Sequence, residues 1–232
     1  MSGTYQAGDR TKSEILQGCK KLFYEKGYTD TTYNDISELL NINRALIPYH
    51  FKSKQALALT VYNEITNYVL SRSSELLDTS SMSDDLAAAF NLIIFYRLFN
   101  NKQFTNLACD IMKENSELLI NPIAEKQLLK QLSDTYAKNN LECDLAISSM
   151  TSVRLSLIKN IRLNNYSSEK NTGKKVSKQF SDIYAKTYIN FALRYIGTSD
   201  ETINELFNAA VQLANLIYID IQTNFKVIVS YK

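Results

Sequence analysis

The stretch between residues 31 and 54 constrains this chain more than any other, because it encodes two short helices joined by a tight corner. Thr32 followed by Asp35 forms the capping signature of a helix start, and a one-faced apolar stripe follows it. Asn41 stands at the corner, where asparagine adopts the left-handed backbone conformation at little cost. Asn43 can cap the second helix. The pattern predicts a helix-turn-helix.

The beginning of the second helix carries the side chains best suited to reading DNA. The major groove admits a helix, and side chains at the N-terminal end of that helix reach base edges. Arg44 can bond O6 and N7 of guanine, and Asn43 can bond adenine or a phosphate. Leu46 and Ile47 can contact a thymine methyl group, although Ile47 is expected to pack into the core.

The start of the first helix supplies candidates for phosphate contacts. Thr32, Tyr33 and Asn34 lie where backbone N–H groups and hydroxyls naturally meet phosphate. A plain helix cap also explains Thr32, and the residue can serve both roles. We therefore expect these three residues to contact the DNA backbone.

Thr11–Glu64 resembles the DNA-binding domain of the TetR family of transcriptional repressors. The most specific part of the resemblance is the run Tyr49-His50-Phe51-Lys52-Ser53-Lys54. The resemblance implies that Tyr49, His50 and Lys54 contact the operator backbone; a solvated surface lysine is the alternative for Lys54. The other matching residues are Ile15, Leu16, Cys19, Leu22, Phe23, Gly27-Tyr28, Thr31-Thr32, Ile36-Ser37, Leu40-Asn41-Ile42 and Leu57.

Pro48 departs from the family pattern, in which a tyrosine that often touches phosphate usually occupies this position. Proline has no backbone N–H, and its ring crowds the carbonyl four residues earlier, at Arg44. It also disfavours helical backbone angles at Ile47. We therefore expect the second helix of the motif to be short, kinked or partly irregular.

Composition favours an all-α fold. The chain has 232 residues, of which 45% are hydrophobic, with two prolines, six glycines and no Asn-Gly or Asp-Gly hairpin signal. We predict about ten helices in two regions: a helix-turn-helix domain at 9–69 with its motif at 32–51, and a helical effector-binding and dimerisation region at 70–232. Helix one is expected to run from Thr11 to about Lys26, after a loose leader at 1–9.

Apolar periodicity divides the rest of the chain into helices separated by polar breaks. A long helix should begin near Ser53 or Lys54, and loops are expected at Asp78–Ser83 and Asn164–Lys175. The further helices are predicted at Asp84–Phe99, Phe104–Lys113, Pro122–Lys138, Asp144–Leu163, 176–196 and 200–225.

The residue types needed for catalysis or metal binding are sparse. His50 is the only histidine and lies inside the motif, and the three cysteines form no CxxC pair, so we interpret them as buried small side chains. Acid pairs such as Asp84-Asp85 stand at helix starts, where the dipole favours them. We expect no enzyme, no metal and no cofactor. A cytoplasmic location is expected because no apolar run suits a membrane span or signal peptide.

The resemblance also implies a homodimer formed by the last two helices, a palindromic operator, and a small apolar ligand that releases the repressor. Aromatic side chains could wall its pocket, although helical spacing places each of them in the core: Tyr62, Tyr68, Phe90, Phe95, Tyr96, Phe99 and Phe104. Asn91, Arg97 and Asn106 are candidates for polar contacts, and the sequence does not choose among them.

The distribution of charge does not decide between DNA binding and other functions. The net charge of +2 is weak for a nucleic-acid binder, although Arg44, Lys52 and Lys54 form a local basic patch without an acid. The basic run Lys159–Lys178 is interpreted as a solvated loop, with an auxiliary anion or DNA site as the alternative. Pro48 and the modest charge also motivate a second hypothesis, in which a protein of this fold has lost operator binding and serves as a protein-interaction or ligand-binding module.

Overall fold

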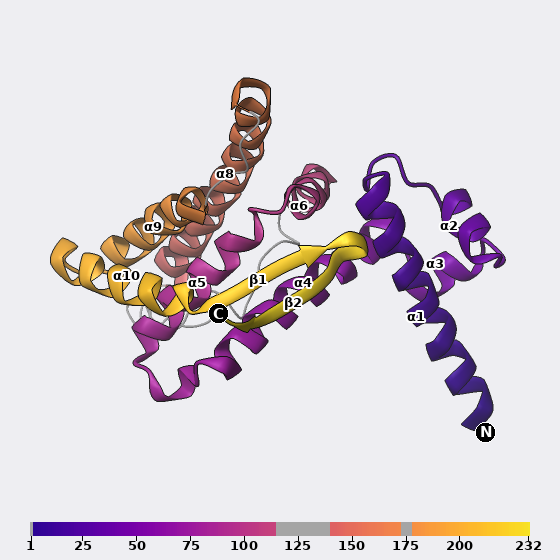
Figure 1. Cartoon of the computed structure of the whole chain (residues 1–232), viewed down its shortest axis with the longest axis horizontal. Helices are drawn as coiled ribbons and strands as arrows, with labels where there is room; N and C mark the ends of the chain where they lie inside the picture. Colours follow the sequence, from indigo (N-terminus) through magenta and orange to yellow (C-terminus); the bar gives the residue numbers. More distant parts are fainter. Residues whose placement is uncertain (1, 115–139, 173–177) are drawn as a thin grey trace.

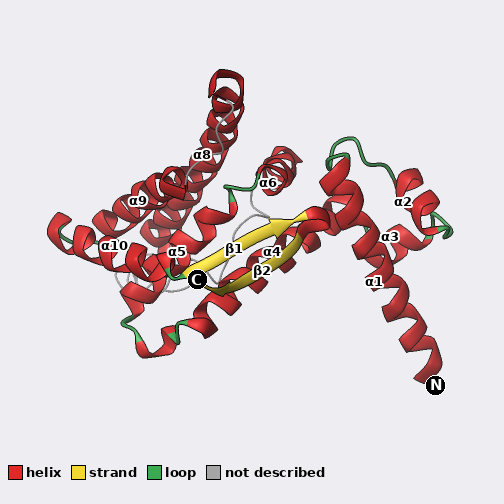
Figure 2. Cartoon of the chain, viewed as in Figure 1, coloured by secondary structure: helices red, strands yellow, loops and turns green. Residues whose placement is uncertain are grey.

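The computed structural model describes residues 2–114, 140–172 and 178–232, and in these residues the protein is predominantly helical, as predicted (Figures 1 and 2). Nine α-helices and one two-stranded antiparallel sheet lie within this described part. The helices are α1 (Ser2–Glu25), α2 (Tyr33–Leu40), α3 (Leu46–Phe51), α4 (Lys54–Leu76), α5 (Asp84–Leu98), α6 (Lys102–Glu114), α8 (Asn140–Thr172), α9 (Lys178–Tyr195) and α10 (Asp200–Asn215).

Helices α1, α2 and α3 form a head at one end of the molecule, remote from α9 and α10 (Figure 1). Buried apolar side chains from all three helices make its core, among them Ile15, Phe23, Ile36 and Ile47. Gly18 of α1 lies against α2: a Cβ atom there would stand 3.0 Å from the side chain of Leu40, so a hydrogen is needed at this close approach.

Helix α4 joins the head to a helical body. It begins where the sequence predicts, because the Ser53 hydroxyl accepts a hydrogen bond from the N–H of Ala56 at 3.0 Å. Its buried side chains contribute to one core that is continuous through the head and body. Helix α4 therefore packs in both regions.

Helix α5 is the most buried helix of the body and packs against α4, α9 and α10. Ser83 caps it, and Asp84 and Asp85 occupy its first turn. Near its end, the side chain of Arg97 is 4% exposed and donates from Nε and Nη2 to the carboxylate of Asp182 on α9, both at 2.8 Å. Arg97 also donates to the carbonyl of Ala214 on α10 at 2.5 Å, so this candidate ligand contact instead ties three helices together.

Two predicted helix boundaries are wrong. Polar residues occur on the exposed face of a helix as readily as in a loop between helices, so they do not by themselves mark the end of a helix. Helix α1 already begins at Ser2, where a loose leader was expected, and α8 continues to Thr172 through most of the predicted loop at Asn164–Lys175. No proline or glycine interrupts the sequence from 140 to 172, so nothing stops that helix. The predicted helix Pro122–Lys138 lies outside the described residues.

The last predicted helix, 200–225, is also wrong in its second half. Helix α10 ends at Asn215, and a hairpin follows: β1 (Ile217–Gln222), the 3-10 turn η3 (Thr223–Phe225) and β2 (Lys226–Tyr231). Ile217 pairs with Tyr231 and Gln222 with Lys226. Ile217 and Ile221 are four residues apart, a spacing that fits one face of a strand as well as one face of a helix. The β-branched alternation of β1 decides for the strand.

Candidate nucleic-acid interface

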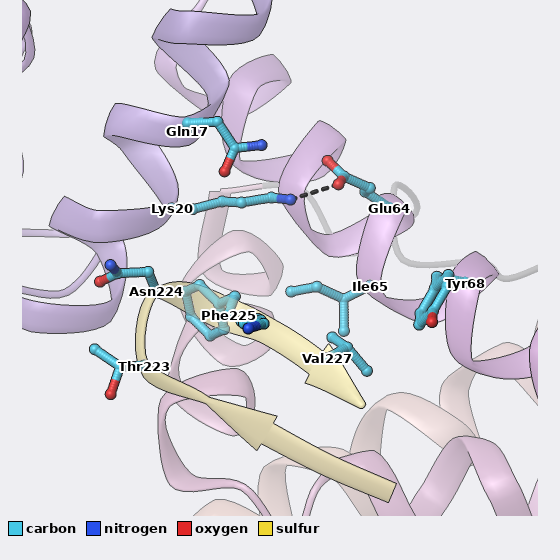
Figure 3. Close-up of a pocket in the computed structure, with 10 residues that line it drawn as sticks. Gln17, Lys20, Glu64, Ile65, Tyr68, Thr223, Asn224, Phe225 and Val227 are labelled. Carbon is cyan, nitrogen blue, oxygen red and sulfur yellow. Dashed lines mark hydrogen bonds and ion pairs between the residues drawn. The ribbon is translucent and has the colours of Figure 1, made fainter. Parts of the chain in front are cut away.

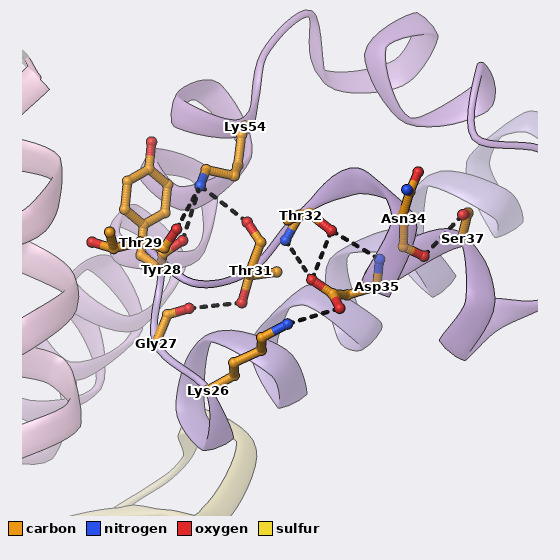
Figure 4. Close-up of polar contacts among 10 residues, drawn as sticks. All are labelled: Lys26, Gly27, Tyr28, Thr29, Thr31, Thr32, Asn34, Asp35, Ser37 and Lys54. Atoms are coloured by element: carbon orange, nitrogen blue, oxygen red, sulfur yellow. Dashed lines mark hydrogen bonds and ion pairs between the residues drawn. The ribbon is translucent and has the colours of Figure 1, made fainter.

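The start of α2 is held by the predicted capping box (Figure 4). The Thr32 hydroxyl oxygen accepts a hydrogen bond from the N–H of Asp35 at 3.2 Å, and the Asp35 carboxylate accepts one from the N–H of Thr32 at 2.7 Å. Thr32 and Asn34 are exposed, whereas Tyr33 is partly buried against the core. Helix α2 therefore presents an ordered, solvent-facing N-terminus, as a phosphate contact requires.

Asp35 also fixes α2 to the end of α1. Its second carboxylate oxygen pairs with Nζ of Lys26 at 2.8 Å (Figure 4). This hydrogen bond from Lys26, followed by those from Thr32, lowers the pKa of Asp35 to about 2. The carboxylate thus stays charged through the whole physiological range.

The corner of the motif has the predicted geometry. Asn41 adopts the left-handed conformation with φ 51° and ψ 48°. Its N–H donates to the carbonyl of Glu38 at 3.3 Å, and the N–H of Ile42 donates to that of Ser37 at 3.1 Å, so the last carbonyls of α2 are satisfied. Ile42 is partly buried and packs against the core of the head.

Helix α3 is short, with six residues, as expected from Pro48. Pro48 is the third residue of this helix, in the first turn, where an N–H has no intrahelical partner, so its missing donor costs little. The Arg44 carbonyl accepts instead from the N–H of Ile47 at 3.2 Å. The expectation that Pro48 removes Ile47 from helical geometry is wrong, because Ile47 lies inside α3 and is fully buried.

The structure exposes two of the four candidate base-reading residues. Asn43 and Arg44 are exposed just before α3. The Asn43 side chain accepts from the N–H of Ala45 at 2.9 Å, but the predicted cap is wrong, because Ala45 is the N-cap of α3 and makes no side-chain hydrogen bond there. Leu46 is half-buried, while Tyr49 is 80% exposed. The Tyr49 ring stands edge-on to the partly buried ring of His50, with centroids 5.1 Å apart. Exposed polar and aromatic groups therefore flank the buried Ile47.

Lys54 has a role that the sequence did not suggest. Its Nζ donates to the carbonyls of Tyr28 and Thr31, both at 3.0 Å, and to that of Thr29 at 3.4 Å (Figure 4). The ammonium also lies 4.4 Å from the centroid of the Tyr28 ring. An ammonium has three donors, and all three point at this loop. Lys54 thus holds the loop that leads into α2.

The same loop contacts the body through two hydrogen bonds. The Tyr28 hydroxyl donates to the carboxylate of Glu114 at 2.7 Å, and the Thr29 hydroxyl donates to that of Asp110 at 3.2 Å. Burial, followed by the bond to Glu114, raises the pKa of Tyr28 well above its usual value. Asp110 also pairs with Arg162 of α8 at 2.9 Å, so α6 connects the head loop with α8. No pattern in the sequence predicts this contact.

The predicted aromatic residues of the body form packed layers. All of them are buried except Tyr68, which is 48% exposed. Tyr62 stacks on Phe104 with centroids 5.4 Å apart, and Phe104 meets Phe99 edge-on at 5.2 Å. Of the polar candidates, Asn91 accepts a hydrogen bond from Ser74 at 3.0 Å.

A cavity of 460 Å³ lies instead between the head, α4 and the hairpin (Figure 3). Lys20 of α1 and Glu64 of α4 form an ion pair on one wall, and the hairpin turn closes another. A second hollow, of 550 Å³, lies along α9 beside Phe191 and Tyr195.

Across the described ranges, no group of three or more His, Cys, Asp or Glu side chains is placed to hold a metal ion. Two of the three cysteines, Cys19 and Cys109, are buried as predicted, and burial raises the pKa of Cys19 to about 12. No helix in the part of the chain that the structure describes is long and apolar enough to cross a membrane.

Comparison with known proteins agrees with the geometry of the head. Residues 15–61 match the model for bacterial regulatory proteins of the tetR family. The probable HTH-type transcriptional regulator ArpR of Pseudomonas putida is 25% identical over 158 residues, which cover 62% of this chain and 74% of that protein. The HTH-type transcriptional regulator TtgR, also of Pseudomonas putida, is 26% identical over 156 residues, which cover 61% of this chain and 73% of that one.

A further relative matches over a shorter stretch at higher identity. The biofilm operon icaADBC HTH-type negative transcriptional regulator IcaR of Staphylococcus aureus is 44% identical over 46 residues, which are 20% of this chain and 25% of IcaR. A solved structure of RolR without ligand aligns with 86% of this chain and 96% of its own at 17% identity, with a TM-score of 0.49. Residues 15–61 are therefore a helix-turn-helix domain of the tetR family of bacterial regulatory proteins, and the relatives that this chain resembles over a longer stretch are transcriptional regulators.

Proposed function

We propose that this DNA-binding regulator is a homodimeric repressor, and that a small apolar ligand releases it from a palindromic operator. The observation that carries the proposal is the exposed start of α3, which follows a left-handed corner at Asn41 and packs on its buried Ile47. In such a motif the side chains that begin the second helix enter the major groove.

In this proposal Arg44 and Asn43 contact base edges, and Leu46 contacts a thymine methyl group. Thr32, Tyr33 and Asn34 approach phosphates at the N-terminus of α2, where free N–H groups and the helix dipole attract anions. The exposed ring of Tyr49 lies beside α3 and suits a backbone contact. His50 and Lys54 act mainly by holding the motif, since one is partly buried and the other is bonded to the loop before α2.

Helix α9 supports the proposed dimer. Ile183, Thr187, Phe191 and Tyr195 recur every fourth residue along it, and Ile183 and Tyr195 are 59% and 39% exposed. An apolar stripe of this kind on an outer helix is typical of a self-association surface. Paired α9 and α10 helices would form a four-helix bundle, and two-fold symmetry would match a palindromic operator.

The proposal divides the chain into two functional regions. We assign 9–69 to DNA binding and 70–232 to effector binding and dimerisation, with α4 crossing the boundary. A ligand that binds the body better in the DNA-incompetent state would weaken operator binding by that difference in affinity. Proteins that bind DNA in this way act where the chromosome is, so the proposal includes a cytoplasmic location.

The alternative function is a protein that keeps the fold and has lost operator binding. Pro48 and the net charge of +2 favour it. The position of Pro48 in the first turn of α3 weakens this argument, because the proline is accommodated there without an unsatisfied backbone group.

A salt titration against the DNA upstream of its own gene separates the two functions. The repressor predicts sequence-specific binding, with the logarithm of the affinity falling by about 0.9 per phosphate contact for each decade of salt. Replacing Arg44 by alanine should abolish the preference for that DNA. Arg72→Ala, which removes an exposed arginine of α4 paired with Glu75, is the control and should bind as the parent does. Equal, weak binding to every sequence would refute the repressor.

A further inference from the structure

The hairpin at the end of the chain reaches from the body to the head (Figure 1). It begins directly after α10, and its base is closed by a hydrogen bond from the N–H of Lys232 to the carbonyl of Leu216 at 2.9 Å. Near the turn end of β1, Asn101 of the body donates to the carbonyl of Ile221 at 2.9 Å. Strand β2 packs along α4, and the turn η3 packs against α1. The hairpin is thus a second connection between body and head, parallel to α4.

The contact of the hairpin turn with the head includes one buried aromatic side chain. Phe225 is 2% exposed, although it belongs to a turn between two strands. Its ring meets that of Tyr24, on the last turn of α1, edge-on with centroids 5.3 Å apart. The ring fills the space between α1 and α4 at the edge of the cavity (Figure 3).

The backbone conformation of the turn is one that a phenylalanine side chain rarely adopts. Asn224 and Phe225 have φ values of 60° and 56°, and the N–H of Lys226 donates to the carbonyl of Thr223. Two central residues at positive φ are the mark of a type I′ hairpin turn, for which Asn-Gly is the favoured pair. Asparagine stands at the first position as expected. A phenylalanine occupies the second, where glycine would be easier, and its ring is buried against Tyr24.

Beside the ring, one part of the junction is open. The cavity of 460 Å³ separates parts of α1 and α4, which are bridged on that wall by the ion pair of Lys20 and Glu64. The Lys20 side chain is 9% exposed, while that of Glu64 is 46% exposed, so the pair is partly screened by solvent. The buried ring of Phe225 is the packed contact beside this open space.

We propose that the C-terminal hairpin fixes the orientation of the DNA-binding head relative to the body, with Phe225 as the positioning residue. The hairpin follows α10 without an intervening loop, so a shift of α10 is transmitted through β1 to the turn and from there to α1. This inference rests on the proposed function for its effect on DNA, whereas its structural part can be tested without DNA.

The test measures the distance between head and body with spin labels on the full-length protein. Labels are attached at Glu38→Cys on α2 and Glu201→Cys on α10, both exposed positions, in a Cys143→Ser background in which Cys19 and Cys109 remain buried. Labelled chains are mixed with excess unlabelled copies, so that each distance is measured within one chain. The parent should give one narrow distance distribution.

Phe225→Gly is the decisive variant, because glycine suits the turn and removes the ring. We expect the hairpin to stay folded, as amide exchange of β1 and β2 would show, while the distance distribution broadens or shifts. Tyr24→Ala, which leaves the hairpin untouched, should broaden it in the same way, and Phe225→Leu should restore most of the narrow distribution. A narrow, unchanged distribution in Phe225→Gly and Tyr24→Ala would overturn the proposal.

Operator binding supplies the second measurement. If the loosened head visits its binding orientation for only part of the time, the affinity of Phe225→Gly should fall by about three- to tenfold, with the salt slope unchanged because no phosphate contact is lost. An affinity equal to that of the parent would also overturn the positioning role. Absence of DNA binding in every variant, together with a broadened distribution, would refute the repressor and leave the hairpin's structural role standing.

Discussion

Lys54 offers the sharpest test of how the head works, because a DNA contact and a structural clamp predict different outcomes for the same substitution. Its ammonium donates to three loop carbonyls at 3.0–3.4 Å, from Tyr28, Thr29 and Thr31. Replacing it by methionine keeps much of the aliphatic stem and removes the donors. A hydrogen bond to a charged group contributes about 1.5–3 kcal/mol. The clamp is partly exposed, so we expect Lys54→Met to lower the free energy of unfolding by about 2–3 kcal/mol in total.

The assay compares urea unfolding with a salt titration of DNA binding. Lys54→Met should shift the unfolding midpoint and weaken binding uniformly, while the salt slope stays that of the parent. Lys52→Met is the matched control: Lys52 is exposed, and we expect this variant to keep its stability and to lose about 0.9 from the slope if it meets a phosphate. A reduced slope with unchanged stability in Lys54→Met would refute the clamp.

The remaining predictions concern the corner, the cap and the body. Asn41→Ala should destabilise the head by about 1–2 kcal/mol because alanine resists the left-handed conformation, whereas Asn41→Gly should be near neutral in the same urea assay. The pKa of Asp35 is about 2 in the folded protein, below its unfolded value of about 3.9. The charged carboxylate therefore stabilises the fold fully above the unfolded pKa, and this stabilisation is lost as the pH falls toward 2. NMR titration of the carboxyl group checks this, and Asp35→Asn should remove the pH dependence. Arg97→Met should lower the free energy of unfolding by about 3–5 kcal/mol because it leaves Asp182 buried without a partner, and adding Asp182→Asn should recover part of that loss.

Local chemistry made the head largely predictable from the sequence. The capping box of Thr32 and Asp35, the left-handed Asn41 and the start of α4 near Ser53 each depend on neighbouring residues, and the structure confirms all three. Helix α3 is short, as expected, but the cost of Pro48 depends on its place in the first turn, and that place depends on where the helix begins.

Long-range contacts were not predictable. The partners of Lys54 lie 23 to 26 residues away in the chain, and those of Tyr28 and Phe225 are more distant still. The hairpin was missed because its isoleucines satisfy both periodicities, and its turn lacks the glycine that usually marks one. In retrospect, the alternation of β1, followed by Asn224 and a second β-branched run, was the available signal.

The direct measurement of base reading replaces guanines of the operator, one symmetric pair at a time, by 7-deazaguanine, which lacks the N7 acceptor. If Arg44 reads a guanine, replacing that guanine in both half-sites should weaken binding of the parent protein. The loss at each half-site should be a part of the binding energy of a bidentate contact, which is about 1–3 kcal/mol. The same replacement should leave the affinity of Arg44→Ala unchanged. Equal losses for the parent and for Arg44→Ala at every guanine pair would contradict the assignment of base reading to the start of α3.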